Sequence, residues 1–301
     1  MTFRIGTRAS ALAMAQSGMI AAQLGGQLVP IVSEGDTSTA SLSTLGGRGV
    51  FATALRDALL AGEVDALVHS FKDLPTTPEP GLAIAAVPER ADARDALCAR
   101  DGLTLLTLPA GARVGTGSPR RRAQLAARRP DLVLVDLRGN VDTRLGRVGA
   151  DDPERRLDAV MLAAAGLERL GRLDAATDLL PLDEWPTAPA QAALAVETRL
   201  GDEHLASAID HAPSRLAADA ERAVLALLGA GCAAPIGAHA FVEDGLLFLS
   251  ATVYRPDGGA SVSSSHAAAF DDDPDAATDL ARRVTDELLG LGAADLAPLT
   301  D

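Results

Sequence analysis

Short apolar runs alternate with amphipathic segments along the first half of the chain. Five apolar runs have the length of buried strands and cover residues 3–5, 64–69, 112–115, 132–137 and 157–162. Helical patterns follow four of them, at residues 11–24, 119–127, 141–148 and 163–170. Ser10 and Ser118 are expected helix N-caps, and Pro119 suits a first helical position. This alternation predicts an α/β fold with parallel sheets covered by helices.

Two proline-rich stretches interrupt the alternation and predict two crossings between two doubly wound α/β domains. They cover residues 75–88 and 181–189, and a helix is expected at residues 190–200, where the chain returns to the first domain. The predicted first domain therefore comprises residues 1–88 and 190–212, and the predicted second domain comprises residues 89–189.

A different pattern follows residue 212 and predicts a small third domain, residues 213–301, of the α+β class. A helix is expected at residues 214–228. Strand-like runs follow at residues 236–242, 246–254 and 261–265, with Asp-Gly turns between them. A last helix is expected from Asp273-Pro274 to Leu289. These elements predict an antiparallel three-stranded sheet with two helices.

Composition and charge narrow the function classes. Of 301 residues, 48% are hydrophobic and 3% aromatic, and the net charge is −14. Few aromatic platforms and a strongly acidic chain disfavour nucleic acid and acidic membranes as partners. No run is long enough to span a membrane, and residues 1–6 lack the apolar core of a signal peptide. The expected location is the cytoplasm. The five histidines show no metal-ligand spacing, so no metal is expected.

One segment is basic although the net charge of the whole chain is negative. Between residues 113 and 147, nine arginines face three aspartates, which gives this segment a net charge of +6. Any one of these arginines can belong to a solvated helix face. Six arginines along the chain lie in loops or first helical turns after predicted strands: Arg8, Arg120, Arg121, Arg138, Arg144 and Arg169. Ligands of α/β sheets bind at these strand ends, where arginine can grip carboxylate or phosphate with two hydrogen bonds. The pattern predicts a ligand with several anionic groups, without distinguishing carboxylates from phosphates.

Two further places carry candidate chemistry. Lys72, the only lysine, and Asp73 follow a predicted strand, where they form either a surface ion pair or a carboxylate held ionised for proton transfer. Cys232 follows a glycine-rich loop that can expose its thiol, although a lone cysteine is often a small buried apolar residue. Cys98 fits a strand and is expected to be structural.

Seven motifs in order along the chain resemble the porphobilinogen deaminase (hydroxymethylbilane synthase) family. The first is Thr7-Arg8-x-Ser10-x-Leu12-Ala13-x-x-Gln16, and the last is Gly231-Cys232-x-x-Pro235-Ile236-Gly237. The other five lie at residues 45–51, 68–75, 115–121, 137–145 and 165–170. The resemblance therefore covers nearly the whole chain. It implies two domains like those of type II periplasmic binding proteins and a third, smaller domain.

The resemblance also implies a reaction. Four porphobilinogens lose ammonia and join head to tail into hydroxymethylbilane on a dipyrromethane cofactor. By similarity, Cys232 holds this cofactor through a thioether, and Asp73 is the catalytic aspartate. The residues that match contacts of the cofactor or of substrate carboxylates are Arg8, Ser10, Lys72, Ser118, Arg120, Arg121, Arg138, Arg144 and Arg169. The family further suggests a monomer that works as a transferase in porphyrin and haem biosynthesis.

Some positions depart from the family pattern. Arg48 stands where lysine is frequent, Ala52-Thr53-Ala54 replaces a more usual apolar-Lys-Glu run, and Pro119 replaces an aliphatic residue. Arg122 extends an arginine pair, and Ala233-Ala234 replaces larger side chains after the cysteine. These changes affect contacts expected from a mobile region around residues 37–51, but they leave Cys232 and Asp73 in place.

Two other functions share part of this pattern. A non-catalytic, two-lobed anion-binding protein accounts for the arginines but not for Cys232 in a third domain. A nucleic-acid binder that uses the basic segment conflicts with the net charge and the scarcity of aromatics. The mass of the Cys232 peptide distinguishes among the three.

Overall fold

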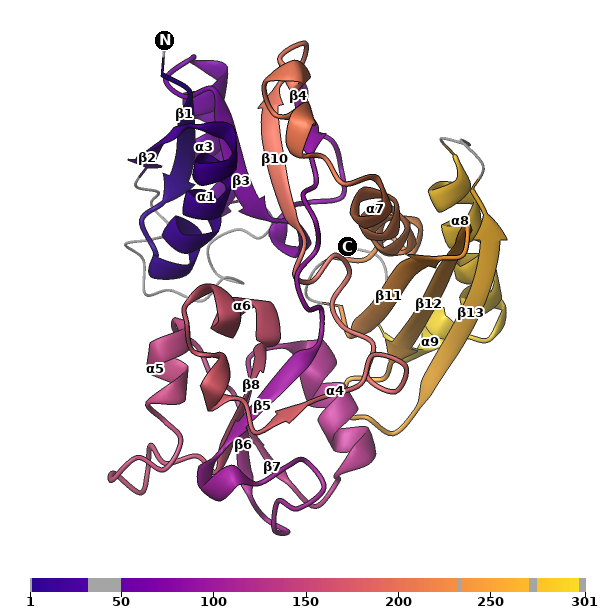
Figure 1. The fold of residues 1–301 in the computed structure, drawn as a ribbon. Helices are drawn as coiled ribbons and strands as arrows, with labels where there is room; N and C mark the ends of the chain where they lie inside the picture. The colour runs from indigo at the N-terminus through magenta and orange to yellow at the C-terminus, as the bar shows by residue number, and fades with distance from the viewer. Residues whose placement is uncertain (1, 32–49, 232–233, 271–274, 298–301) are drawn as a thin grey trace.

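The structure, a computed structural model, describes residues 2–31, 50–231, 234–270 and 275–297. Figure 1 shows three units: an N-terminal sheet with its helices, a second sheet below it, and a third sheet with helices to one side. The carboxyl ends of parallel strands and the loops after them lie where the first two units meet. The fold therefore directs the carboxyl ends of these strands toward the boundary between the two units.

The first sheet has the strand order β2-β1-β3-β10-β4. Its strands are β1 (Arg4–Arg8), β2 (Gln27–Ile31), β3 (Ala66–Ser70), β4 (Leu82–Ala86) and β10 (Leu194–Arg199). β1 pairs in parallel with β2 and β3, whereas β10 is antiparallel to β3 and β4. Helices α1 (Ala11–Leu24) and α3 (Val50–Leu60) pack on opposite faces, because Val68 contributes to the core beneath α1 and the adjacent Leu67 to the core beneath α3.

The second sheet repeats this topology in the order β7-β6-β8-β5-β9. Its strands are β5 (Asp95–Ala99), β6 (Arg113–Gly115), β7 (Val133–Val135), β8 (Ala159–Ala163) and β9 (Asp178–Leu179). Helix α4 (Pro119–Arg128) covers one face, and α5 (Val141–Leu145) with α6 (Ala164–Arg169) covers the other. In both sheets the fourth strand is antiparallel and comes from a crossing segment. The expectation of two α/β units is confirmed.

The third unit is an antiparallel sheet backed by helices on one face. Its strands β11 (Ile236–Glu243), β12 (Leu246–Tyr254) and β13 (Ser261–Ala269) lie in sequence order. Helices α7 (Ala212–Leu227), α8 (Ala276–Gly290) and α9 (Ala293–Leu296) pack against the inner face of the sheet, with Val224 and Leu280 in the shared core. The predicted three-stranded antiparallel sheet is confirmed.

Five short 3₁₀ helices complete the described elements: η1 (Phe71–Asp73), η2 (Arg100–Gly102), η3 (Leu173–Ala175), η4 (Glu203–Leu205) and η5 (Ser207–Ile209). Ser10 and Ser118 cap α1 and α4 as expected. The strand predicted at residues 3–5 continues to Arg8, and β13 continues to Ala269. The expected start of the last helix at Asp273-Pro274 lies outside the described residues.

The helix predicted at residues 190–200 is wrong. This segment forms β10, which lies between β3 and β4 and is buried along nearly its whole length. Alanine and leucine have high helix propensity, but pairing with two neighbouring strands outweighs that local preference. A continuous apolar run does not distinguish a buried strand from a buried helix by periodicity.

A buried carboxylate joins the third unit to the crossing segments. Glu221 of α7 is fully buried and accepts hydrogen bonds from both Nη atoms of Arg90, at 2.7 and 2.9 Å. It also accepts from the backbone N–H groups of Ala190 (2.5 Å) and Ala240 (2.7 Å). Burial raises the pKa of Glu221, but the charge of Arg90 and its hydrogen bonds, together with His239, outweigh this effect and lower it. One side chain therefore ties residues 90 and 190, which lie just after the two crossings, to the third sheet.

The turn between β12 and β13 packs directly on α4 of the second unit. Gly258 in this turn has φ +75°, and a Cβ at this position would lie 2.5 Å from Ala127 N and 2.7 Å from Ala123 O. Gly245, in the other hairpin turn, has φ +76° and no atom within 4 Å of such a Cβ. The two glycines therefore share the same backbone conformation, but only Gly258 also lies against another domain.

Gly258→Ala is expected to lower the melting temperature more than Gly245→Ala does. Both variants carry the strain of a left-handed alanine, about 1–2 kcal/mol, while only the first also pushes the third unit away from α4. Differential scanning calorimetry of the two variants and the wild type measures the difference. Equal losses in the two variants would show that the contact with α4 contributes nothing to stability.

Candidate functional site at the boundary of the two α/β units

Cations that follow strands of the first two units meet across their boundary. Lys72 Nζ, after β3, and Arg121 Nη2, after β6, lie 3.4 and 3.5 Å from the same atom, Gln191 Oε1. Arg169, at the end of α6, donates from Nη2 to the Ala192 carbonyl at 2.6 Å. Figure 1 shows α6 directly below the first sheet. The structure thus brings together predicted site residues from distant parts of the chain.

The first unit contributes the end of β1 and the start of α1. Arg8 is the last residue of β1 and is partly buried. The Ser10 hydroxyl oxygen accepts a hydrogen bond from Ala13 N at 3.3 Å, which caps α1. Ser10 is exposed, so its hydroxyl hydrogen can still be donated to a ligand.

The turn η1 holds the predicted catalytic carboxylate. Asp73 is exposed, and no side-chain hydrogen bond or ion pair of its carboxylate is found among the described residues. Burial lowers the pKa of the neighbouring Lys72, whereas the charge of Asp73 raises it. Arg121 also lowers the Lys72 pKa, which places positive charge from the second unit nearby. An accessible carboxylate therefore lies next to a partly desolvated cationic cluster.

Asp95, the first residue of β5, is a buried centre that sequence reasoning missed. Its Oδ1 accepts from Arg121 Nη2 at 2.7 Å and Gln191 Nε2 at 2.8 Å. Its Oδ2 accepts from Arg120 Nη1 and Trp185 Nε1, both at 2.9 Å. Burial raises the Asp95 pKa, but the two guanidinium charges outweigh this effect and hold it well below its usual range.

Arg120 and Arg121 are therefore buried more deeply than is expected for two side chains that contact a ligand. Arg120 is 3% exposed, and its Nη1 also donates to Gln124 Oε1 (2.6 Å) and the Pro186 carbonyl (3.2 Å). Arg121 is 6% exposed and donates from Nη1 to the Met161 carbonyl at 3.1 Å. Arg120 thus lies inside the second unit, and the role of both side chains in carboxylate binding remains a prediction.

The other predicted site residues of the second unit lie at or near its surface. Ser118 caps α4 by accepting from Arg121 N at 3.4 Å, and Arg138 is exposed, 3.7 Å from Asp136. Arg144 donates from Nε to the Gly139 carbonyl at 2.8 Å. Burial lowers the pKa of Arg144, and the charges of Arg121 and Arg138 lower it further, with Asp136 opposing them. Positive charge therefore exceeds negative charge here.

Three buried guanidinium nitrogens have no acceptor among the described residues. These are the Nε atoms of Arg120, which lies inside the second unit, and of Arg121 and Arg169 at the boundary. Burial also lowers the pKa of Arg169. Buried donors without partners are costly, and a multiply anionic group would supply acceptors. The donor set of this region fits a ligand with several carboxylates.

Gln191 is a second residue that sequence reasoning missed. It is fully buried, and its Nε2 donates to the Ala93 carbonyl at 2.8 Å as well as to Asp95. Its neighbours Ala190 and Ala192 have φ of +59° and +71°, a region that alanine enters at a cost. Strained backbone of this kind is frequent at functional sites. The only sequence signal was a polar side chain inside an alanine-rich run.

The predicted cofactor anchor, Cys232, lies outside the described residues, and so does the predicted mobile region from residue 37 to residue 49. Helix α7 ends at Leu227, and the described chain continues to Gly231. Cys98 lies in β5, is 2% exposed and is unpaired. Burial raises the pKa of its thiol to about 11, so it stays protonated at neutral pH, in agreement with a structural role.

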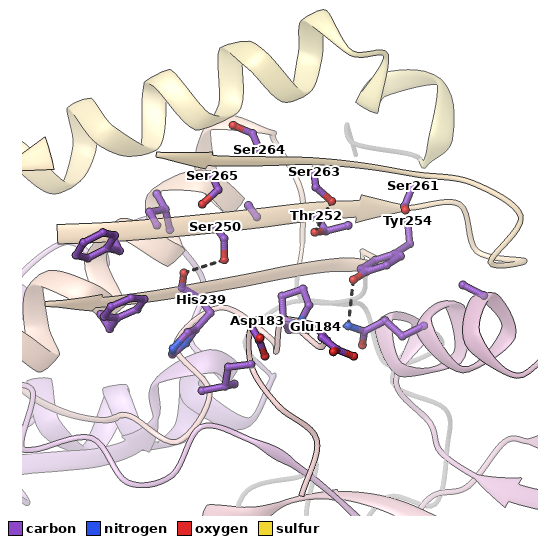
Figure 2. A pocket seen from close by; sticks show the side chains of 18 of the residues that line it. Asp183, Glu184, His239, Ser250, Thr252, Tyr254, Ser261, Ser263, Ser264 and Ser265 are labelled. Carbon is purple, nitrogen blue, oxygen red and sulfur yellow. Dashed lines mark hydrogen bonds between the residues drawn. The ribbon is translucent and has the colours of Figure 1, made fainter. Parts of the chain in front are cut away.

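A pocket of about 860 Å³ lies elsewhere, between the outer face of the third sheet and the second unit. Figure 2 shows serines of β12 and β13 on one side, with Asp183 and Glu184 opposite. Phe241 stacks on Phe248 with ring centroids 4.8 Å apart. Among the described residues, none of the predicted site residues lines this pocket. The cationic cluster is therefore a separate region.

The described parts of the chain contain neither a membrane-spanning helix nor a cluster of metal-binding side chains. No helix in residues 2–31, 50–231, 234–270 and 275–297 is long and apolar enough to cross a membrane. Within the same ranges, no group of three or more His, Cys, Asp or Glu side chains is placed to hold a metal ion.

Family models match almost the full chain. Residues 3–207 match the model described as "Porphobilinogen deaminase, dipyromethane cofactor binding domain". Residues 215–290 match the model described as "Porphobilinogen deaminase, C-terminal domain". The two matches divide the chain close to the start of α7.

Curated relatives agree with the family models. The chain is 60% identical to the porphobilinogen deaminase of Leifsonia xyli subsp. xyli, over 98% of this chain and 94% of the relative. It is 52% identical to that of Thermobifida fusca, over 96% and 94%.

Solved structures also resemble the chain. One is an ABC transporter protein from Parabacteroides distasonis, with a TM-score of 0.41 and 15% identity over 74% of each chain. Another is an arginine-specific periplasmic binding protein from Salmonella typhimurium, with a TM-score of 0.36 and 15% identity over 69% of this chain and 91% of that one.

Proposed function

The chain belongs to the porphobilinogen deaminase family, and we propose that three parts of it divide the work of that family's reaction. These are the predicted site cations at the boundary of the two α/β units (the boundary cations), the carboxylate of Asp73, and the thiol of Cys232. Enzymes of this family are transferases that join four porphobilinogens into hydroxymethylbilane, with loss of ammonia, on a dipyrromethane cofactor. The observation that carries the division of roles is the meeting of Lys72, Arg121 and Arg169 beside an exposed Asp73.

The cations are proposed to bind carboxylates. Porphobilinogen carries an acetate and a propionate, so each added ring brings two negative charges into the site. Arg8, Arg138, Arg144 and Arg169 offer guanidinium donors at strand or helix ends, and the unpartnered Nε atoms of Arg121 and Arg169 are further donors. Lys72, Ser10 and Ser118 are proposed to add an ammonium and two hydroxyl contacts. Arg120 is proposed to act through Asp95, which it shares with Arg121.

Asp73 is proposed to be the catalytic residue. When ammonia leaves porphobilinogen, the ring system becomes a cation, and a carboxylate held close to that cation stabilises it. The same carboxylate can accept the proton that the pyrrole carbon at the free end of the growing chain loses after it has attacked the cation and formed the new carbon–carbon bond. It can then pass this proton to the departing amine of the next substrate. The exposed position of Asp73 leaves its oxygens accessible to the substrate.

Cys232 is proposed to be the anchor of the cofactor. The cofactor supplies a free pyrrole end to which the growing chain attaches. The residues of this chain that fit its acidic side chains are the boundary cations described above. Because the thioether is formed once and then kept, Cys232 does not need the low thiol pKa of a turnover nucleophile.

The mass of the purified protein tests the anchor. We expect wild-type protein to exceed its sequence mass by two pyrrole units and the surplus to map to the Cys232 peptide. Cys98→Ala should retain the surplus and Cys232→Ala should lose it together with activity. An active wild-type enzyme without any added mass would remove Cys232 from this role.

The three-domain division is also proposed: residues 1–88 with 190–212, residues 89–189, and residues 213–301. Membership of β4 and β10 in the first sheet and of β5 and β9 in the second supports these limits. We further propose, from the family, a monomer that works in the cytoplasm. Light scattering of the purified enzyme measures the oligomeric state.

A further inference from the structure

An arginine of the third domain binds the backbone of the turn that carries Asp73. Arg222 of α7 donates from Nη1 to the carbonyl oxygens of Phe71 (3.0 Å) and Leu74 (2.9 Å). It donates from Nη2 to the Pro75 carbonyl at 2.7 Å. Three carbonyls within five residues thus converge on one guanidinium, whose planar donors suit such an arrangement.

The turn is also packed against the same helix. Phe71 is 2% exposed and shares a core with Ala218 of α7. The Arg222 guanidinium carbon lies 4.3 Å from the centre of the Phe71 ring, which adds a cation–π contact. Burial lowers the pKa of Arg222 to about 10, so the side chain remains charged at neutral pH. Both the backbone and the one aromatic ring of the turn therefore contact Arg222.

Within the part of the chain that the structure describes, the Asp73 carboxylate has no comparable support from side chains. No hydrogen bond to its oxygens is found within the described residues, and the residue is exposed. The location of its oxygens is consequently set by the backbone of residues 71–75. The only backbone bonds that hold η1 are Phe71 N to the Ala193 carbonyl (3.0 Å) and Leu74 N to the Phe71 carbonyl (3.3 Å), as far as the described residues go. The Arg222 bonds add three more.

We propose that Arg222 is a positioning residue for Asp73, which fixes the catalytic carboxylate from the third domain by binding the carbonyls of its turn. This inference rests on the proposed catalytic role of Asp73. Arg222 touches neither substrate nor cofactor in this assignment. Because α7 ends five residues before Cys232, the same helix leads to the anchor and braces the turn of the acid–base group.

Variants of the full-length holoenzyme test the proposal. Arg222→Gln should lower kcat about 10- to 100-fold with KM within threefold of wild type, because a misplacement of about 1 Å is enough for such a loss. Arg222→Lys keeps a charged donor and should recover part of the rate. Arg215→Gln is the matched control: Arg215 lies two turns earlier on α7 and binds Asp210 and the Ile84 carbonyl, away from η1. It should keep the wild-type kcat.

Hydrogen exchange gives a readout that does not depend on activity. The amides of Phe71 and Leu74 should exchange about tenfold faster in Arg222→Gln than in wild type, with the rest of the first sheet unchanged. Arg215→Gln should leave these two amides as in wild type. Unchanged exchange at Phe71 and Leu74 in Arg222→Gln would overturn the proposal, whatever the rate.

A double-mutant cycle separates positioning from general stabilisation. Asp73→Glu retains a carboxylate on a longer arm, and single-turnover mixing with porphobilinogen measures even slow rates. If Arg222 acts through Asp73, adding Arg222→Gln to Asp73→Glu should lower the single-turnover rate less than threefold. An undiminished 10- to 100-fold loss in that background would refute the positioning role while leaving Asp73 catalytic. A wild-type rate in Asp73→Glu and Asp73→Asn would instead refute the proposed function of Asp73.

Discussion

Asp73→Asn should lower kcat by about 10²- to 10⁴-fold, the usual contribution of a positioned acid–base group. Asparagine keeps the size of the side chain but neither carries a charge to face the substrate cation nor accepts a proton. Because Asp73 is exposed and its carboxylate makes no contact that holds the described fold together, the melting temperature should stay within about 1 °C of wild type. Steady-state rates of porphobilinogen consumption and a thermal melt measure both quantities.

Asp57→Asn is the matched control for this variant. Asp57 is an exposed carboxylate on α3 of the same unit, so the substitution changes net charge equally and should leave kcat as in wild type. A purified, cofactor-loaded Asp73→Asn enzyme with a rate near wild type would exclude Asp73 from the mechanism. A rate loss accompanied by a large fall in melting temperature would assign Asp73 to the fold instead.

Asp95→Asn should lower the free energy of unfolding by about 3–5 kcal/mol, because the buried Arg120 and Arg121 then lose the counter-charge that they share. This corresponds to a fall in melting temperature on the order of 10 °C. The amide of the variant would also place an NH₂ group, which is itself a donor, where a carboxylate oxygen of Asp95 now accepts hydrogen bonds from its neighbours. Calorimetry measures the loss of stability.

The control for this prediction is Asp92→Asn. Asp92 pairs with Arg94 near the surface, with side-chain exposures of 32% and 40%, and such a pair contributes at most about 1 kcal/mol. A loss as small in Asp95→Asn as in Asp92→Asn would contradict the structural importance of the buried cluster.

The effect of Asp95 should also depend on pH. Its pKa is lowered in the folded protein relative to about 3.9 in the unfolded chain, so its stabilisation is complete above about pH 4 and is lost as the pH falls further. The stability difference between wild type and Asp95→Asn should therefore narrow below about pH 4. A constant difference from pH 7 to pH 3 would show that the carboxylate charge is not what stabilises the cluster.

Local signals in the sequence were sufficient to predict the elements whose ends depend only on residues nearby in the chain. The caps Ser10 and Ser118 located the starts of α1 and α4, and the Asp-Gly turns located the hairpins of the third sheet. The prediction for the segment that forms β10 was wrong because its strand conformation depends on pairing with β3 and β4, which are more than a hundred residues distant in sequence. Strand pairing at this distance leaves no periodic trace in an alanine-rich segment.

The candidate site shows the same limit. Lys72 and Arg121, both expected after strands, lie at one boundary in the structure, whereas Arg169 reaches it from the last turn of α6 and not from the first. Strand-end position did not separate Arg120, which is directed into the second unit, from its neighbour Arg121, because both occupy the first turn of α4. Asp95 and Gln191 were missed because their importance comes from partners that only the folded chain supplies.

The strand order of the first sheet has a consequence for synthesis on the ribosome. Among the described strands, β4 joins that sheet only through β10, and β10 is translated after all those of the second sheet. A nascent chain that has emerged as far as residue 180 can already close the second sheet, while the first still has an open edge at β3. The second unit should therefore mature earlier, although it begins later in the chain, and the exposed edge of β3 is the point at which a chaperone would be needed most.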